Sequence, residues 1–146
     1  MNIRKNHMRL CFDSKSANES FARVAVSAFM SQLSPTLEEI NDVKTAVSEA
    51  VTNAIVHGYK DESGEVVIDA SLWDDGRVII DVSDTGCGID DISQAMTPFF
   101  TSQPEMERAG MGFAVMQTFM DDVRVTSRPG QGTSVFMVKR VKGSAK

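Results

Sequence analysis

The sequence contains few cysteines, no long apolar run and no excess of positive charge. Its two cysteines, Cys11 and Cys87, are far apart and lack metal-ligand spacing. One disulfide is arithmetically possible, but a reduced protein is favoured over a disulfide-stabilised scaffold. No apolar run approaches the roughly 20 residues that a membrane-spanning helix needs. The N-terminal segment has no signal-peptide core, so we expect a cytoplasmic protein.

The missing positive charge narrows the choice of partners. The chain has 15 Lys and Arg against 20 Asp and Glu, which gives a formal net charge of -5. Nucleic-acid-binding proteins usually present a basic face, so this balance weighs against direct nucleic-acid binding. A chain of 146 residues with 42% hydrophobic residues can build one core. We therefore predict a single domain over residues 1–146.

Local patterns in the first half predict one strand and two helices. The weakly alternating segment 7–13 predicts the strand. Two capping boxes, Ser16–Glu19 and Thr36–Glu39, have a hydroxyl residue followed three positions later by glutamate, which predicts a helix start at each. We expect the second helix to run to about Tyr59, because the preceding Gly58 favours a helix end.

The second half predicts two hairpins around an irregular segment. Residues 65–73 and 77–84 alternate and flank a turn containing Gly76, and residues 122–127 and 133–140 flank a second glycine-containing turn. Segment 84–112, rich in Gly, Pro, Thr and Ser, is typical of a functional loop.

A short helix over 112–122 follows that segment. Together these elements predict an α+β two-layer sandwich, with helices on one face of a mostly antiparallel, mixed sheet.

The second predicted helix carries three polar residues at four-residue steps, Glu49, Asn53 and His57. At about 100° per residue, Glu49 and Asn53 lie close together opposite the apolar side. A solvated helix face accounts for this pair about as well as a functional site does. For His57, a capping or packing role is favoured over catalysis.

Three glycine-containing motifs follow. Asp84-Thr-Gly86-Cys-Gly88 ends an apolar strand, where its glycines allow a ligand to approach closely and its aspartate can accept a hydrogen bond from an amino group such as that of adenine. Gly110-Met-Gly112 precedes the short helix, where free amides suit a phosphate. Upstream, Arg108 could reach a terminal phosphate from a lid. Gly130-Gln-Gly132-Thr133 lies in the last hairpin. Ordinary turns and a solvated arginine are the alternatives.

In this order the motifs resemble the GHKL superfamily of ATPases and kinases. The stretches S-E-A-V-T-N-A-I-V-H-G-Y, P-E-M-E-R-A-G-M-G-F, F-M-D-D-V and N-E-S-F-A-R-V are similar to the anti-sigma-F factor family, serine kinases of spore-forming bacilli. The similarity extends over nearly the whole chain, and the general-stress anti-sigma factors are close relatives of this family. The chain has neither a G-x-x-x-x-G-K-[ST] phosphate loop nor protein-kinase motifs.

The resemblance implies a role for each candidate residue. Glu49 matches the general base or polariser, Asn53 the magnesium ligand, and Arg108 a lid arginine that senses the terminal phosphate and the docked partner. Arg23 and Thr52 match positions linked to partner and nucleotide contact. The residues implied to bind ATP are Asn53, Asp84, Gly86, Gly88, Thr101, Gly110, Met111, Gly112, Phe113 and Thr133.

The implied function is a partner switch. A homodimer with ATP and Mg²⁺ would hold the sporulation sigma factor sigma-F away from RNA polymerase. It would also transfer the γ-phosphate to a serine of a small anti-anti-sigma protein and so inactivate that protein. Histidine kinases have an amide where Glu49 stands, and a carboxylate favours a serine hydroxyl or water over histidine as the acceptor.

The sequence is also compatible with other functions. The protein could be a general-stress anti-sigma kinase of the same group. A nucleotide-gated sigma-binding module without significant catalysis would not need Glu49. The catalytic half of a histidine kinase, or a gyrase-type ATPase clamp, would need further segments that the sequence does not contain.

Overall fold

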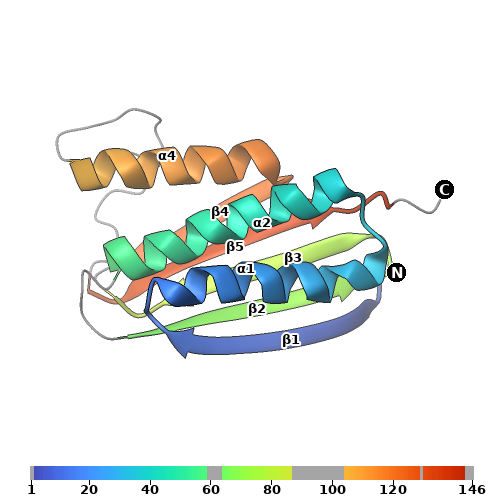
Figure 1. The fold of residues 1–146 in the computed structure, drawn as a ribbon, viewed down its shortest axis with the longest axis horizontal. Helices are drawn as coiled ribbons and strands as arrows, with labels where there is room; N and C mark the ends of the chain where they lie inside the picture. The colour runs from blue at the N-terminus through green and yellow to red at the C-terminus, as the bar shows by residue number, and fades with distance from the viewer. Residues whose placement is uncertain (1, 59–63, 87–103, 129, 144–146) are drawn as a thin grey trace.

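The computed structural model describes residues 2–58, 64–86, 104–128 and 130–143, without the side chains of residues 57, 58, 104–111 and 128. Within these residues, three α-helices cover one face of a five-stranded sheet (Figure 1). The predicted two-layer α+β architecture is therefore confirmed. Within the described residues, every helix is too short or too polar to cross a membrane.

The elements follow the predicted order, with longer strands and helices than expected at several ends. The sheet order is β1-β2-β3-β5-β4, and each neighbouring pair is antiparallel. The mixed component that we expected is thus absent among the described strands. The elements are β1 (Arg4–Asp13), α1 (Ala17–Met30), a 3-10 turn (Ser31–Leu33), α2 (Leu37–Thr52), a π-helix (Asn53–Gly58), β2 (Glu65–Trp73), β3 (Arg77–Asp84), α4 (Pro104–Phe119), β4 (Asp122–Arg128) and β5 (Gly132–Arg140).

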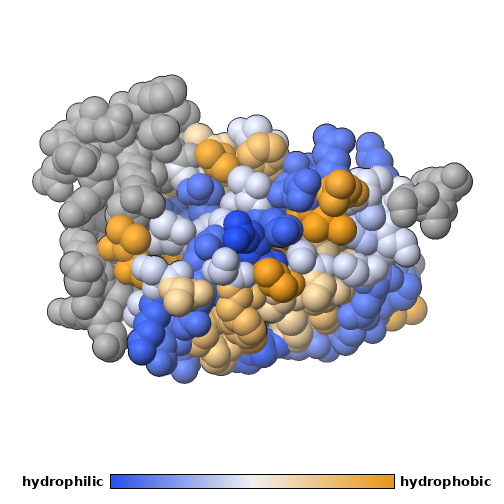
Figure 2. All heavy atoms as spheres, viewed as in Figure 1, coloured by the Kyte–Doolittle hydropathy of each residue, from blue (hydrophilic) through white to orange (hydrophobic). Residues whose placement is uncertain are grey.

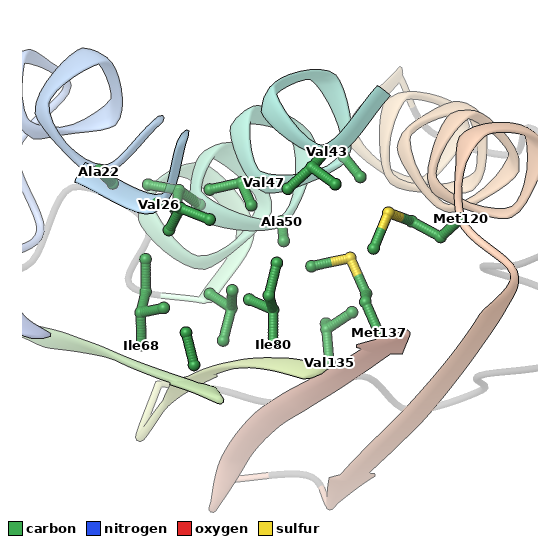
Figure 3. Packing of buried hydrophobic residues seen from close by; sticks show 14 of the residues in the cluster. Ala22, Val26, Val43, Val47, Ala50, Ile68, Ile80, Met120, Val135 and Met137 are labelled. Atoms are coloured by element: carbon green, nitrogen blue, oxygen red, sulfur yellow. The ribbon is translucent and has the colours of Figure 1, made fainter. Parts of the chain in front are cut away.

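The hydrophobic core fills the space between the helices and the sheet. Alternate residues of the strands point toward the helices, as period-two patterning requires. Ile68 of β2 and Ile80 of β3 meet Val47 and Ala50 of α2 in this layer (Figure 3). All four are essentially inaccessible to solvent. Because α2 lies between α1 and α4 over the sheet, its position is fixed from three sides (Figure 1).

The start of α2 is tied to the end of the chain. The capping box predicted at Thr36–Glu39 is confirmed, with Thr36 Oγ1 accepting from the Glu39 amide at 3.1 Å and Glu39 Oε1 accepting from the Thr36 amide at 2.8 Å. Glu39 also accepts from the amides of Lys142, at 2.7 Å, and Gly143, at 3.3 Å. One carboxylate thereby joins a helix start to the segment that follows β5.

A second polar link holds the far end of α4. The Lys139 ammonium group, on β5, donates to Asp42 Oδ2 at 3.0 Å and to the carbonyl of Phe119 at 2.8 Å. Lys139 and Asp42 are both mostly buried, so this ion pair is less screened by solvent than a surface pair. It connects α2, β5 and the last turn of α4.

The capping box predicted at Ser16–Glu19 is wrong. Ser16 has helical backbone angles and its side chain caps no amide. The Glu19 carboxylate instead accepts a hydrogen bond from the Ser48 hydroxyl of α2. A partner on the neighbouring helix has replaced the local cap.

We expect Glu39→Ala to lower the free energy of unfolding by about 1–2 kcal/mol, because α2 loses its capping box and the tail amides lose their acceptor. Although burial alone would raise the pKa of Glu39, hydrogen bonds from the amides of Lys142, Thr36 and Gly143 hold it below its ordinary value. The stability that Glu39 contributes is therefore complete above the pKa of the unfolded chain, and it is lost as pH falls through the lower folded-state pKa.

Thermal unfolding of wild type, Glu39→Ala and Glu38→Ala across acid and neutral pH tests this expectation. Glu38 is an exposed carboxylate in the same first turn, so it controls for charge near the helix start. Equal losses in both variants would show that the hydrogen bonds of Glu39 contribute nothing specific.

Candidate functional site

The candidate acid and amide lie where the second helix changes its winding. Glu49 is in the last turn of α2, and Asn53 is the first residue of the π-helix that continues to Gly58. π-helical turns are rare and occur frequently at functional sites. The predicted helix to about Tyr59 is confirmed through Gly58, and Tyr59 lies outside the described residues. The His57 side chain also lies outside them.

Glu49 and Asn53 face α4 and are half-buried rather than fully solvated. A Cβ atom placed on Gly112 of α4 would lie 3.1 Å from Glu49 Oε2 and 3.1 Å from Asn53 Nδ2. Both side chains therefore converge on one point. Within the described part of the chain, Asn53 Nδ2 is buried and has no hydrogen-bond partner. A buried amide nitrogen that the protein leaves unpaired is typical of a position that a ligand completes.

We predicted that the second glycine motif precedes its helix, and this prediction is wrong. α4 begins at Pro104, so Gly110 and Gly112 lie inside it and their amides are not at a helix start. Proline is favoured at the first helical position. The good helix formers that follow it outweigh the cost of about 1 kcal/mol for each glycine.

A row of polar residues closes the other end of the candidate site. Asp84 ends β3 and is the strand partner of Thr133 on β5. Asp84 Oδ1 accepts from the Gly86 amide at 2.9 Å. Burial raises the pKa of the Asp84 carboxyl above its ordinary value, and the amides of Gly86 and Thr133 offset part of this effect by hydrogen bonding.

Sequence reasoning missed Ser127, which completes this row. Ser127 is the partner of Thr133 across β4 and β5, and the two hydroxyl oxygens are 2.8 Å apart. Only the register of the predicted last hairpin could have indicated this neighbour.

Gly132 lets the last hairpin approach β3 closely. Its φ of +98° is in the left-handed region that favours glycine, and a Cβ atom there would lie 2.1 Å from the Asp84 carbonyl oxygen. No side chain fits in that space. Gly132 therefore sets how Asp84 and Thr133 meet.

The remaining predicted residues divide into four groups. Gly88 and Thr101 lie outside the described residues, and Arg108, Gly110 and Met111 are placed on α4 only by their backbone. Phe113 is buried in the hydrophobic core. Two residues, Arg23 and Thr52, lie on helices beside the site.

Arg23 projects from α1, and Thr52 is the last residue of α2. Arg23 Nη2 donates to Ser20 Oγ at 3.1 Å, and its buried Nε has no hydrogen-bond partner among the described residues. The structure therefore brings together Glu49, Asn53 and Gly112 directly, and Asp84, Gly86 and Thr133 at the neighbouring strand ends.

Comparison with known proteins identifies related chains and folds. The family of the histidine kinase-like ATPase domain matches residues 12–139. The anti-sigma F factor of Clostridium novyi is 59% identical over 138 residues, covering 94% of this chain and 96% of that protein. The anti-sigma F factor of Pasteuria penetrans is 53% identical over 143 residues, covering 97% and 95%. The solved RsbU and RsbW domains of Rv1364c from Mycobacterium tuberculosis share the fold, with a TM-score of 0.69, 23% identity and coverage of 94% of this chain and 32% of that chain.

Gly132→Ala should destabilise the protein more than Gly130→Ala. Both glycines have positive φ, but a Cβ atom on Gly130 would meet no atom within 4 Å. Each variant should lose about 1–2 kcal/mol for its backbone conformation, and Gly132→Ala should lose about 1–3 kcal/mol more because its methyl group displaces β3. Chemical denaturation of the two variants measures the difference, and equal losses would contradict the close approach.

Asp84→Asn should raise the thermal unfolding temperature at neutral pH by a few degrees, because the raised pKa means that ionised Asp84 destabilises the folded state. Asparagine keeps the acceptor for the Gly86 amide without the charge. The advantage should shrink as pH falls through the raised pKa, since folded wild type then takes up a proton. A variant that is less stable at neutral pH would contradict this account.

Proposed function

The chain belongs to the anti-sigma F factor family of histidine kinase-like ATPase domains, and we propose that it is an ATP-dependent serine kinase that binds and inhibits the sigma factor sigma-F. Its substrate is a serine of a small anti-anti-sigma protein, which phosphorylation inactivates. Residues 1–146 form one catalytic domain. The observation that carries the proposal is the convergence of Glu49 and Asn53 on Gly112.

The adenine of ATP binds at the strand ends. Asp84 lies at the end of β3 beside Thr133, and its carboxylate accepts a hydrogen bond from the exocyclic amino group of the base. Gly86 and Gly88 leave room for the ring. The phosphates then extend toward α4, where Gly110, Met111 and Gly112 contact them, and Arg108 of the same helix and Thr101 add further contacts. Phe113, which we expected among the phosphate contacts, anchors this part of α4 in the hydrophobic core. Arg108, which we expected on a lid, belongs to α4.

The residues at the other end fit a magnesium ion that the phosphates hold in large part. Mg²⁺ usually keeps several waters and takes one or two protein oxygens together with substrate phosphates. Among the described residues, no cluster of three or more His, Cys, Asp or Glu side chains could hold a metal alone. The side-chain oxygen of Asn53 would be the single protein ligand of such a site, and Asn53 Nδ2, which has no hydrogen-bond partner among the described residues, could donate to a phosphate oxygen. When bound, the ion neutralises charge on the phosphates.

Glu49 acts on the attacking hydroxyl. It lies one helical turn from Asn53, so the amide side chain serves the phosphate end while the carboxylate meets the nucleophile. As the serine oxygen forms its bond to the γ-phosphorus, Glu49 accepts the hydroxyl proton. The bond between the γ-phosphorus and its bridging oxygen breaks, and ADP leaves. Phosphoryl transfer depends mostly on such positioning.

The partners dock beside the site on α1. Phe21 and Val24 are about half exposed, at 51% and 58%, and hydrophobic side chains gather near α1 on this face of the molecule (Figure 2). Arg23 lies between them in sequence, on the same helix, and its buried Nε has no hydrogen-bond partner among the described residues. Arg23, with Thr52 and Arg108, contacts sigma-F or the anti-anti-sigma protein. The active form is a homodimer in the cytoplasm, where sigma factors meet RNA polymerase.

The intact mass of the anti-anti-sigma partner after incubation with the protein, ATP and Mg²⁺ tests this function. Wild type should add one phosphate. Glu49→Ala should retain ATP and sigma-F binding but lose transfer by at least about 100-fold, because a general base typically contributes that much in the transition state. Glu38→Ala, at the other end of α2, is the matched control and should behave as wild type.

Asn53→Ala should weaken binding of ATP with magnesium as well as transfer, which separates the two roles. If neither wild type nor Glu49→Ala adds phosphate although ATP binds tightly, the protein is a nucleotide-gated sigma-binding module and the kinase proposal fails.

A further inference from the structure

Three polar side chains lie in one row across the end of the sheet. Asp84, Thr133 and Ser127 are direct strand partners on β3, β5 and β4. The adjacent row on the same face is Val82, Val135 and Val125, of which Val82 and Val135 belong to the buried core. Because side chains two residues apart on a strand share a face, the polar row faces the helix layer, next to the candidate site.

The hydrogen bonds in this row have a defined direction. A carbonyl oxygen can only accept, so Ser127 Oγ donates its single proton to the Gly132 carbonyl, at 3.0 Å. In the 2.8 Å contact between the two hydroxyls, Thr133 must then be the donor. Because the Thr133 O–H donates to Ser127, the Thr133 oxygen can act only as an acceptor toward any other group.

The backbone around Gly132 holds this arrangement in place. The Gly132 carbonyl accepts a hydrogen bond from the Ser127 hydroxyl. Gly132 also approaches the Asp84 backbone so closely that no Cβ atom fits. Thr133 itself is 9% exposed, so water competes little for its hydroxyl. The tight hairpin thus keeps solvent away from the hydrogen bond between the Ser127 and Thr133 hydroxyls.

Ionised Asp84 is a hydrogen-bond acceptor. The neighbouring Thr133 hydroxyl, whose O–H already donates to Ser127, is an acceptor as well. Adenine offers an amino group with two N–H donors at its six position, whereas guanine offers a carbonyl oxygen there. The carbonyl oxygen of guanine would face the two acceptors of Asp84 and Thr133. It would be repelled and would lose the hydrogen bonds that it makes with water. The row therefore discriminates between a six-amino and a six-oxo purine.

We propose that Ser127 is a specificity-determining positioning residue, which orients the Thr133 hydroxyl as an acceptor so that the site selects adenine over guanine nucleotides. The inference rests on the proposed nucleotide function and names a residue beyond it. Ser127 acts through Thr133 and does not itself touch the reacting atoms.

The test measures dissociation constants for non-hydrolysable ATP and GTP analogues with Mg²⁺ by calorimetry. In Ser127→Ala, the Thr133 hydroxyl is released and can donate to a six-oxo group. The preference for the ATP analogue over the GTP analogue should fall by about tenfold, in line with one misdirected buried hydrogen bond. Ser127→Thr retains the hydroxyl and should keep the wild-type preference.

Thr126→Ala is the matched control, because Thr126 is the neighbouring residue on the opposite sheet face and is exposed. It should change neither constant. If Ser127→Ala weakens both analogues equally, the residue is only structural and the inference is overturned. An unchanged preference overturns it as well. If wild type binds neither analogue, the proposed nucleotide function fails and the inference fails with it.

Discussion

The close approach of α4 to α2 at Gly112 is the constraint on which the candidate site depends. Without a side chain at this position, α4 can lie against Glu49 and Asn53 and cover both of them. The helices on either side support this contact, since α2 is packed between α1 and α4 over the sheet. The Lys139 link to Asp42 and Phe119 then holds the far end of α4. Packing of α2 between its neighbouring helices thus places the polar pair.

A second glycine, Gly132, allows a similarly close approach at the strand ends. Gly132 removes the side chain that would separate β5 from the Asp84 backbone, so Thr133 meets Asp84 directly. The site therefore depends on two glycines that allow close approach, Gly112 between two helices and Gly132 between two strands. At the first of these glycines lies Asn53 Nδ2, which has no hydrogen-bond partner among the described residues, and at the second lies the buried Asp84 carboxyl, whose pKa is raised. Both features cost stability in the free protein, which is common where a ligand completes the structure.

Local signals predicted most of the fold, and of the two failures one has a non-local cause and the other a local one. The capping box at Thr36–Glu39 and the two hairpins depend on residues close in sequence, and the structure confirms them. The box at Ser16–Glu19 failed because Glu19 finds Ser48, 29 residues away. The start of α4 failed because propensity over several residues outweighed two glycines.

The candidate site was predictable as a set of motifs but not as a geometry. Spacing placed Glu49 and Asn53 on one side of a helix, yet only the packed structure shows that they meet at Gly112. Ser127 carries no motif of its own, and its position depends on the register of a hairpin. Roles implied for Gly88 and Thr101 remain predictions, because these residues lie outside the described part of the chain.

The central claim is that the helix pair and the strand row form one nucleotide site. Amide chemical-shift mapping of the isotope-labelled protein, titrated with a non-hydrolysable ATP analogue and Mg²⁺, tests it most directly. The account predicts that shifts concentrate at residues 49–53, 84–86, 112–113 and 132–133, and that the outer sheet face around Asp69 and Arg9 stays unchanged. Shifts confined to the outer face, or to only one of the two halves of the site, would contradict it.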